Sequence, residues 1–308
     1  MAPNAEILES SQPNPEFEQA CCPNPLDLTS IIANSQSSPP LPSKVSIESL
    51  QTVTNVLKAK ARETLRGPPP NLTKRDIEIP IHDGRSILAY IYAPSPDTIT
   101  DTLPILIFFH KDSFCIDSRH DKLESNRTIA IEAGIIIVSL EYSLAPEYPF
   151  PQAIHDRIDA SIANAVVYLN RDLDSPIKVT GQLLSIASLL PISMVPERYK
   201  DNYMSHEQNH NIAPNPTSPL FACAVHPSEH TKIPPTYLQA CGLDTLRDET
   251  FIYQQILQQK NNIDTRIDLY PRLPHHFWEF FPQLRKHVKK RTDNTVKEIQ
   301  WLLKNSQT

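Results

Sequence analysis

The sequence is poor in glycine and rich in proline. Its 308 residues include 5 glycines and 30 prolines, whereas average usage predicts about 22 and about 15. Glycine permits positive φ and the close approach of backbone to a ligand. Turns that depend on glycine therefore have few places to occur, and those places are Gly67, Gly84, Gly134, Gly181 and Gly242.

Other absences exclude several classes of protein. No apolar run approaches the roughly 18 residues of a spanning helix, and no basic segment followed by an apolar run opens the chain. The five cysteines lack C-x-x-C spacing, so we expect reduced thiols, no zinc or other metal, no cofactor and a cytoplasmic location. The net charge of −6, with both signs interspersed, provides no basic surface for nucleic acid.

The chain length suits one large α/β domain or two small ones. Residues 1–70 are predicted to form an arm and cap helix, because 1–45 are polar and rich in Pro and Ser and 45–65 show helical spacing. We expect part of this arm to be disordered. Residues 71–308 are predicted to form the core.

The centre of the core has the pattern of a parallel sheet. Two short apolar runs, Ile105–Phe109 and Ile135–Leu140, are separated by a segment of helix length, which is the spacing of a βαβ unit. Before them, Lys74–Pro80 and Ser86–Ala93 alternate as an antiparallel hairpin does. Later apolar patterns predict a helix over 151–169, a strand over Thr265–Tyr270 and a final helix over 288–303.

The residues after the two central runs resemble the motifs of a known family. H-K-D-S-F follows the first run and Y-S-L-A-P-E the second. They are similar to the H-G-G-G-F and D-Y-R-L-A-P-E motifs of the hormone-sensitive-lipase-like branch of α/β-hydrolases, which are carboxylesterases and lipases. The resemblance implies an α/β-hydrolase fold, with a mostly parallel central sheet, helices on both faces and a reduced N-terminal cap.

The same resemblance places two of the three residues of a catalytic triad. Asp244 occupies the first aspartate of the family's D-P-L-R-D-E motif, and His275 the histidine of its H-G-F motif. His276 then stands at the glycine of that motif. Acid before histidine is also the order of α/β-hydrolases, so we expect His275 within hydrogen-bond reach of Asp244.

The nucleophile is missing from this sequence. The family carries a strand, a serine turn and a helix at a point where this chain passes directly from Leu169 to Ile177, and no G-x-S-x-G occurs anywhere. Lys111, Asp112 and Ser113 replace the glycines whose N–H groups would bind the oxyanion. Ser113, Cys115, Ser185 and Ser188 lie near candidate active-site strands, but none follows the strand-to-helix pattern of a serine elbow.

Several functions are therefore compatible with the sequence. The first is an esterase-like protein without serine-esterase activity, and the second is a binding protein for a small apolar, ester-like or other hydrophobic molecule. The third uses His275 and Asp244 as a general base in altered chemistry. If the absence of the segment is an error in the coding sequence, the protein would be an ordinary esterase. The sequence does not indicate the oligomeric state.

The missing segment also leads to a prediction about the sheet. Ile105–Phe109 and Ile177–Ile186 are apolar on both faces, so neither suits an exposed edge at the centre of a domain. We therefore expect the two strands to pair directly, as parallel neighbours.

Overall fold

The computed structural model describes somewhat more than half of the chain. The described residues are 9–11, 14–17, 70–80, 84, 86–95, 102–109, 123–141, 160–173, 175–190, 194–203, 205, 223–227, 230–281 and 283–305. Most of the predicted arm and cap helix, and positions 110–122, lie outside them. Among the described residues, no helix is both long and apolar enough to cross a bilayer.

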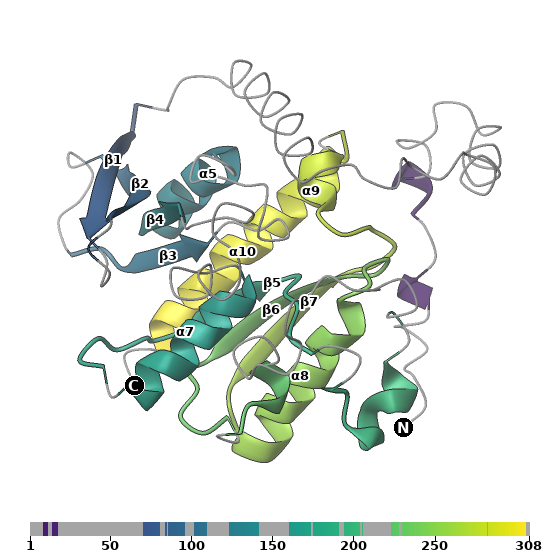
Figure 1. Cartoon of the computed structure of the whole chain (residues 1–308). Coiled ribbons are helices and arrows are strands. Elements are labelled where there is room, and N and C mark those ends of the chain that lie inside the picture. Colours follow the sequence, from purple (N-terminus) through teal and green to yellow (C-terminus); the bar gives the residue numbers. More distant parts are fainter. Residues whose placement is uncertain are drawn as a thin grey trace, which may run out of the picture.

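The first half of the core is a four-stranded sheet in the order β1-β2-β4-β3 (Figure 1). Antiparallel pairing joins β1 to β2 and β2 to β4, whereas β3 and β4 are parallel. The predicted hairpin and βαβ unit are therefore confirmed. The strands are β1 (Leu72–Pro80), β2 (Ser86–Pro94), β3 (Ile105–Phe109) and β4 (Ile136–Glu141).

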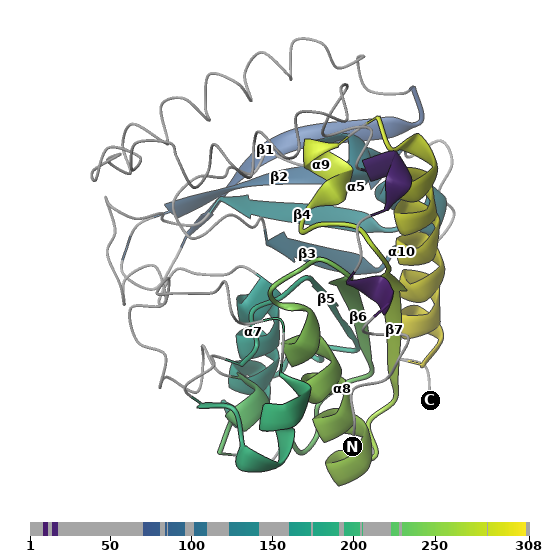
Figure 2. The same cartoon turned by 90° about the vertical axis from the view of Figure 1, so that its right-hand side faces the viewer.

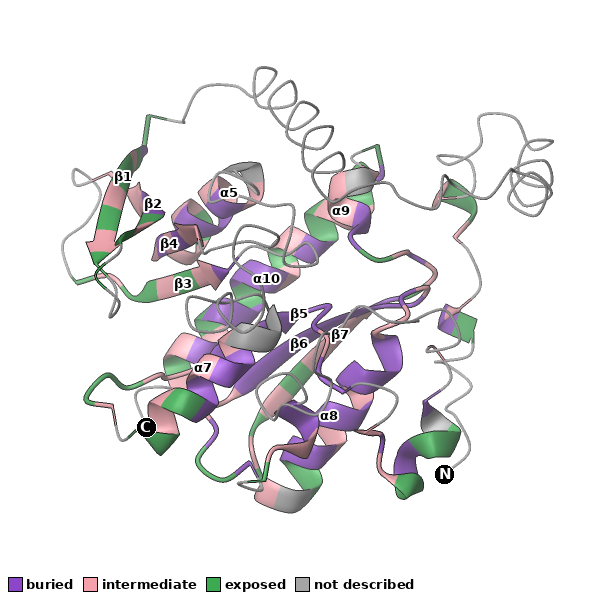
Figure 3. Cartoon of the chain, in the orientation of Figure 1, coloured by how far each residue is buried: buried purple, intermediate pink, exposed green. Residues whose placement is uncertain are grey.

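The second half is a three-stranded parallel sheet in the order β5-β6-β7. Every residue of β6 is buried, whereas β3 at the edge of the first sheet alternates between exposed and partly buried residues (Figure 3). The hydrophobic centre of this half is thus built around β6. Its strands are β5 (Gln182–Ser185), β6 (Thr236–Cys241) and β7 (Thr265–Tyr270).

Helices cover both faces of the two sheets (Figure 2). On one face, α10 packs on β6, β7 and α5, while on the other α7 contacts β3 and β5 and α8 covers β6 and β7. Because α10 and α7 each touch both halves, they hold the two sheets together. The helices are α5 (Leu123–Ala133), α7 (Ala160–Asp172), α8 (Arg247–Asn261), α9 (Phe277–Phe280) and α10 (Arg285–Asn305), with short 3₁₀ turns η3 (Glu197–Asn202) and η5 (Cys223–Val225).

The predicted pairing of β3 with the following strand is wrong. No hydrogen-bonded ladder joins β3 to β5, and the predicted strand over 177–186 is reduced to Gln182–Ser185, with Ile177 72% exposed. Side chains of both strands line the space that separates them, and α7 packs against β3 and β5 at once. Close-packed interiors have low compressibility, which opposes closing this space.

A short N-terminal segment packs on the second half. The backbone of Arg272 donates to Ser10 O (2.7 Å) and accepts from Asn14 N (2.9 Å), and Phe17 meets Phe281 edge to face. Gly242 permits this approach, because a Cβ there would lie 2.1 Å from the carbonyl oxygen of Ser10. Residues 9–11 and 14–17 are thus attached beside the turn that follows β6.

Candidate active site

The predicted carboxylate lies in the turn between β6 and α8. Asp244 is buried, and its Oδ1 accepts the N–H of Leu246 at 2.9 Å. The N–H of Arg247 in turn donates to the backbone oxygen of Asp244 at 3.2 Å, which closes the turn at the start of α8. The carboxylate is therefore held in one orientation by the backbone around it.

The predicted histidine lies beside this carboxylate. His275 Nδ1 is 2.7 Å from Asp244 Oδ2, which is the hydrogen-bond contact expected from the sequence. The histidine side chain is 43% exposed and the aspartate side chain 1%. A buried carboxylate that accepts from Nδ1 fixes the imidazole ring and leaves Nε2 toward the more open side.

The neighbour of this histidine adopts an unusual backbone conformation. His276 has φ 56° and ψ 30°, in the left-handed region that a glycine enters without strain. This explains why a glycine suits the position in the family motif. The ring of His276 is buried and stacks on that of His275, with centroids 4.6 Å apart.

The rest of the D-T-L-R-D-E motif is structural. Arg247 and Asp248 form a buried ion pair at 2.7 Å. Glu249 accepts the N–H groups of Leu189 and Leu190, at 2.6 and 2.5 Å. Burial raises the pKa of Glu249 to about 8, although these two hydrogen bonds act in the opposite direction. The motif thus fastens the loop after β5 to the start of α8.

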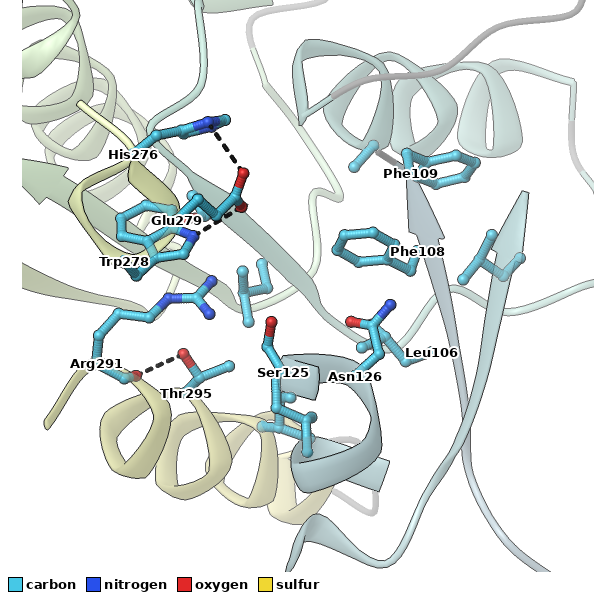
Figure 4. A pocket seen from close by; sticks show the side chains of 16 residues that line it. Leu106, Phe108, Phe109, Ser125, Asn126, His276, Trp278, Glu279, Arg291 and Thr295 are labelled. Carbon is cyan, nitrogen blue, oxygen red and sulfur yellow. Dashed lines mark hydrogen bonds and ion pairs between the residues drawn. The ribbon is translucent and has the colours of Figure 1, made fainter. Parts of the chain in front are cut away.

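A cavity occupies the space between the two sheets (Figure 4). Residues of β3 and β5 line it from either side, and α5, α7, α9 and α10 close it. About 80 Å³ is available to the centres of water-sized molecules. We call this space the central cavity. It is mostly apolar, with polar groups from Ser185, Asn126, Glu279 and Arg291 among its lining residues.

Several known proteins are similar in sequence to this chain. The profile of a family described as the alpha/beta hydrolase fold matches residues 106–166. An AB hydrolase superfamily protein of Schizosaccharomyces pombe is 25% identical, over 78% of this chain and 83% of its own. Versiconal hemiacetal acetate esterase of Aspergillus parasiticus is 24% identical, over 76% and 85%. This chain is therefore similar to proteins of the α/β-hydrolase superfamily over most of its length.

Solved structures agree with this assignment of the fold. Vibralactone cyclase superposes with a TM-score of 0.74 at 22% identity, covering 97% of each chain. An esterase of Pyrobaculum calidifontis superposes with a TM-score of 0.68 at 20% identity, covering 88% of this chain and 98% of the esterase. The fold of this chain is therefore the α/β-hydrolase fold, and its motifs resemble those of the hormone-sensitive-lipase-like branch.

Other predicted site positions are only partly described. Lys111, Asp112 and Ser113, and the alternative nucleophile Cys115, lie outside the described residues. Ser185 lies on β5 and is buried, and its Oγ has no hydrogen-bond partner. Within the described part of the chain, His275 contacts Asp244 and His276, and no serine or cysteine side chain forms a hydrogen bond with it.

Sequence reasoning missed the polar lining of the central cavity. Arg291 lies on α10 with a guanidinium that points into the cavity (Figure 4). A signal was available, because Arg291, Thr295, Ile299 and Leu302 follow one another at helical spacing along the buried face of α10. An arginine among the residues of a buried helix face indicates a buried positive charge. Among the described residues, no cluster of three or more His, Cys, Asp or Glu side chains could hold a metal.

Proposed function

We propose that this chain is a hydrolase-fold protein that binds a small hydrophobic molecule and does not hydrolyse esters as a serine esterase. The observation that carries the proposal is the central cavity. It occupies the position between β3 and β5, where the family resemblance places the nucleophile strand. The acid–base pair of Asp244 and His275 remains, at 2.7 Å.

The size of the expected catalytic defect supports this assignment. A histidine and carboxylate activate a nucleophile but do not replace it. Loss of a catalytic serine lowers the rate on the order of a millionfold. Replacement of the oxyanion glycines by Lys111, Asp112 and Ser113 adds a further defect, since loss of a single donor lowers the rate about 100- to 1,000-fold.

The cavity itself supports the binding function. Phe108 and Phe109 of β3, Leu183 of β5 and Ile129 of α5 are among its walls, and apolar walls with few polar groups are typical of small-molecule sites. The relatives named as esterases support an ester-like or similar hydrophobic ligand. The histidine and aspartate then remain as a structural hydrogen bond at the end of β6.

Ester hydrolysis tests the proposal. We expect purified protein to release p-nitrophenol from p-nitrophenyl acetate and butyrate no faster than buffer, and no faster than its His275→Ala variant. The protein should also remain unlabelled by a serine-directed fluorophosphonate. Turnover above buffer that the fluorophosphonate abolishes would show an active serine esterase and overturn the proposal.

A second candidate function is acid–base catalysis without a covalent step. It is favoured by the contact between Asp244 and His275 and by the 43% exposure of the His275 side chain, because a general base must reach its substrate. This candidate predicts turnover that the fluorophosphonate leaves intact and that His275→Ala removes. The absence of turnover would leave the binding function.

A further inference from the structure

One charged residue of the central cavity, Arg291, is buried near one carboxylate, that of Glu279, whose charge favours the protonated guanidinium. Arg291 is 9% exposed and lies in the middle of α10. Its guanidinium carbon lies 4.5 Å from the centroid of the Trp278 ring, and its Nε is buried without a hydrogen-bond partner. Within the described residues, the guanidinium forms no ion pair and no hydrogen bond.

The guanidinium nevertheless keeps its charge. Burial lowers the pKa of Arg291 from its ordinary value, but that value lies so far above neutrality that the group stays protonated. Glu279 also lines the cavity. Its carboxylate accepts a hydrogen bond from Trp278 Nε1 (3.1 Å) and lies 3.6 Å from His276 Nδ1. The charge of Glu279 favours protonated Arg291, but a buried guanidinium whose N–H groups make no hydrogen bond is still unfavourable.

Two further buried donors line the same cavity. Asn126 is 2% exposed and Ser185 5%, and the Nδ2 of the first and the Oγ of the second have no hydrogen-bond partner. Figure 4 shows the guanidinium of Arg291 directed into the space beside Ser125 and Asn126. Buried polar groups are ordinarily paired, so a positively charged, donor-rich centre inside an apolar wall indicates an acceptor that carries negative charge.

We propose that the central cavity binds a small carboxylate with an apolar chain, and that Arg291 pairs with the carboxylate. This inference rests on the proposed small-molecule binding function and specifies its ligand class. A planar guanidinium presents two parallel N–H groups that match the two oxygens of a carboxylate. Leu106, Ile129 and Leu183, which line the cavity, would contact the apolar chain. The modest free volume favours a short chain.

Calorimetric titration with sodium hexanoate tests the inference. The wild-type protein should bind hexanoate, and 1-hexanol, of the same length but uncharged, should bind at least tenfold more weakly. Arg291→Met keeps an unbranched apolar stem and removes the charge. It should weaken hexanoate binding about 10- to 100-fold, as expected for a charge-assisted hydrogen bond. Arg285→Met, an exposed arginine on the same helix, should leave the affinity unchanged.

Thermal unfolding separates a binding role from a structural one. Without ligand, Arg291→Met should melt at or above the wild-type temperature, since it removes an unpaired buried charge. Hexanoate should raise the wild-type melting temperature but not that of Arg291→Met. If Arg291→Met does not fold, Arg291→Lys, which lacks the planar fork, must bind hexanoate more weakly than Arg285→Lys does.

Three results would overturn the inference: no hexanoate binding by the wild type, equal binding of hexanoate and hexanol, or unchanged affinity in the Arg291 variants. The two proposals fail separately. Ester hydrolysis would refute the absence of esterase activity while leaving the carboxylate affinity measurable. A failure of hexanoate to bind would leave the absence of hydrolysis intact.

Discussion

At the scale of single residues, buried ionisable groups decide most of what this fold does. Asp244, Glu249 and Arg291 are all buried, but they differ in their hydrogen-bond partners. Asp244 accepts from a histidine and a backbone N–H, and Glu249 accepts from two backbone N–H groups. Arg291 alone among these three has no such partner. The first two therefore fix the structure, whereas the third is suited to a ligand.

Glu249 should make the stability of the protein depend on pH. Its pKa rises from 4.5 in the unfolded chain to about 8 in the folded protein, chiefly because of burial. Between these values the folded state holds one more proton, so the free energy of unfolding should fall as pH rises, by up to about 1.4 kcal/mol per pH unit. Glu249→Gln, which carries no charge, should lose this dependence.

Urea unfolding at pH 5.5, 6.5 and 7.5 measures this effect. The slope of stability against pH should be steeper in the wild type than in Glu249→Gln. Glu197→Gln, which alters an exposed carboxylate, should behave as the wild type does. Equal slopes in the wild type and Glu249→Gln would show that the carboxylate is charged in the folded state across this range.

At the scale of elements, Gly242 determines whether the N-terminal segment can pack on the core. A side chain there would meet the backbone of Ser10 at 2.1 Å and that of Arg272 at 2.5 Å. Gly242→Ala should therefore release residues 9–17 and lower stability by about 1–3 kcal/mol. At Gly181 the new Cβ would meet only the flexible Leu302 side chain, at 3.1 Å, so Gly181→Ala is a milder control.

Hydrogen exchange read by mass spectrometry can follow this release. Peptides that contain residues 9–17 should exchange faster in Gly242→Ala than in Gly181→Ala, and β6 should keep its protection in both. Unchanged exchange of the N-terminal peptides in Gly242→Ala would show that the segment is held by contacts other than this close approach.

The sequence predicted single elements better than it predicted their assembly. The hairpin, the βαβ unit, β7 and the contact of His275 with Asp244 followed from local pattern and family motif. The separation of β3 from β5 did not follow, because it depends on the packing of side chains and helices around both strands. Arg291 was likewise overlooked, since a lone arginine on an amphipathic helix is usually exposed.

At the scale of the whole molecule, the core consists of two sheets rather than one. Among the described elements, side-chain and helix packing bridge them, including Leu183 of β5 in one cluster with Leu106 and Phe108 of β3, whereas no backbone ladder joins β3 to β5. Cooperative units of a protein often coincide with such groups of elements. Every residue of β6 is buried. The half that contains β6 should therefore open less readily than the half whose edge strand is β3.

Native-state hydrogen exchange at low urea concentrations tests this difference. The slowest amides of β6 should report a larger opening free energy than those of β3, and the two should respond differently to urea. A single opening free energy shared by both sheets would show that side-chain and helix packing make the molecule one cooperative unit.

The position of α10 has a consequence for biosynthesis. This helix follows all the described strands in the chain, and it covers both sheets. At about 5–20 residues per second, roughly 10–40 seconds separate the synthesis of β3 from that of α10. During that interval Leu106 and Phe108 of β3, which pack against the cluster that contains Val296 and Ile299 of α10, lack the cover of the last helix. Nascent chains of this protein should depend on ribosome-associated chaperones until the final helix leaves the exit tunnel.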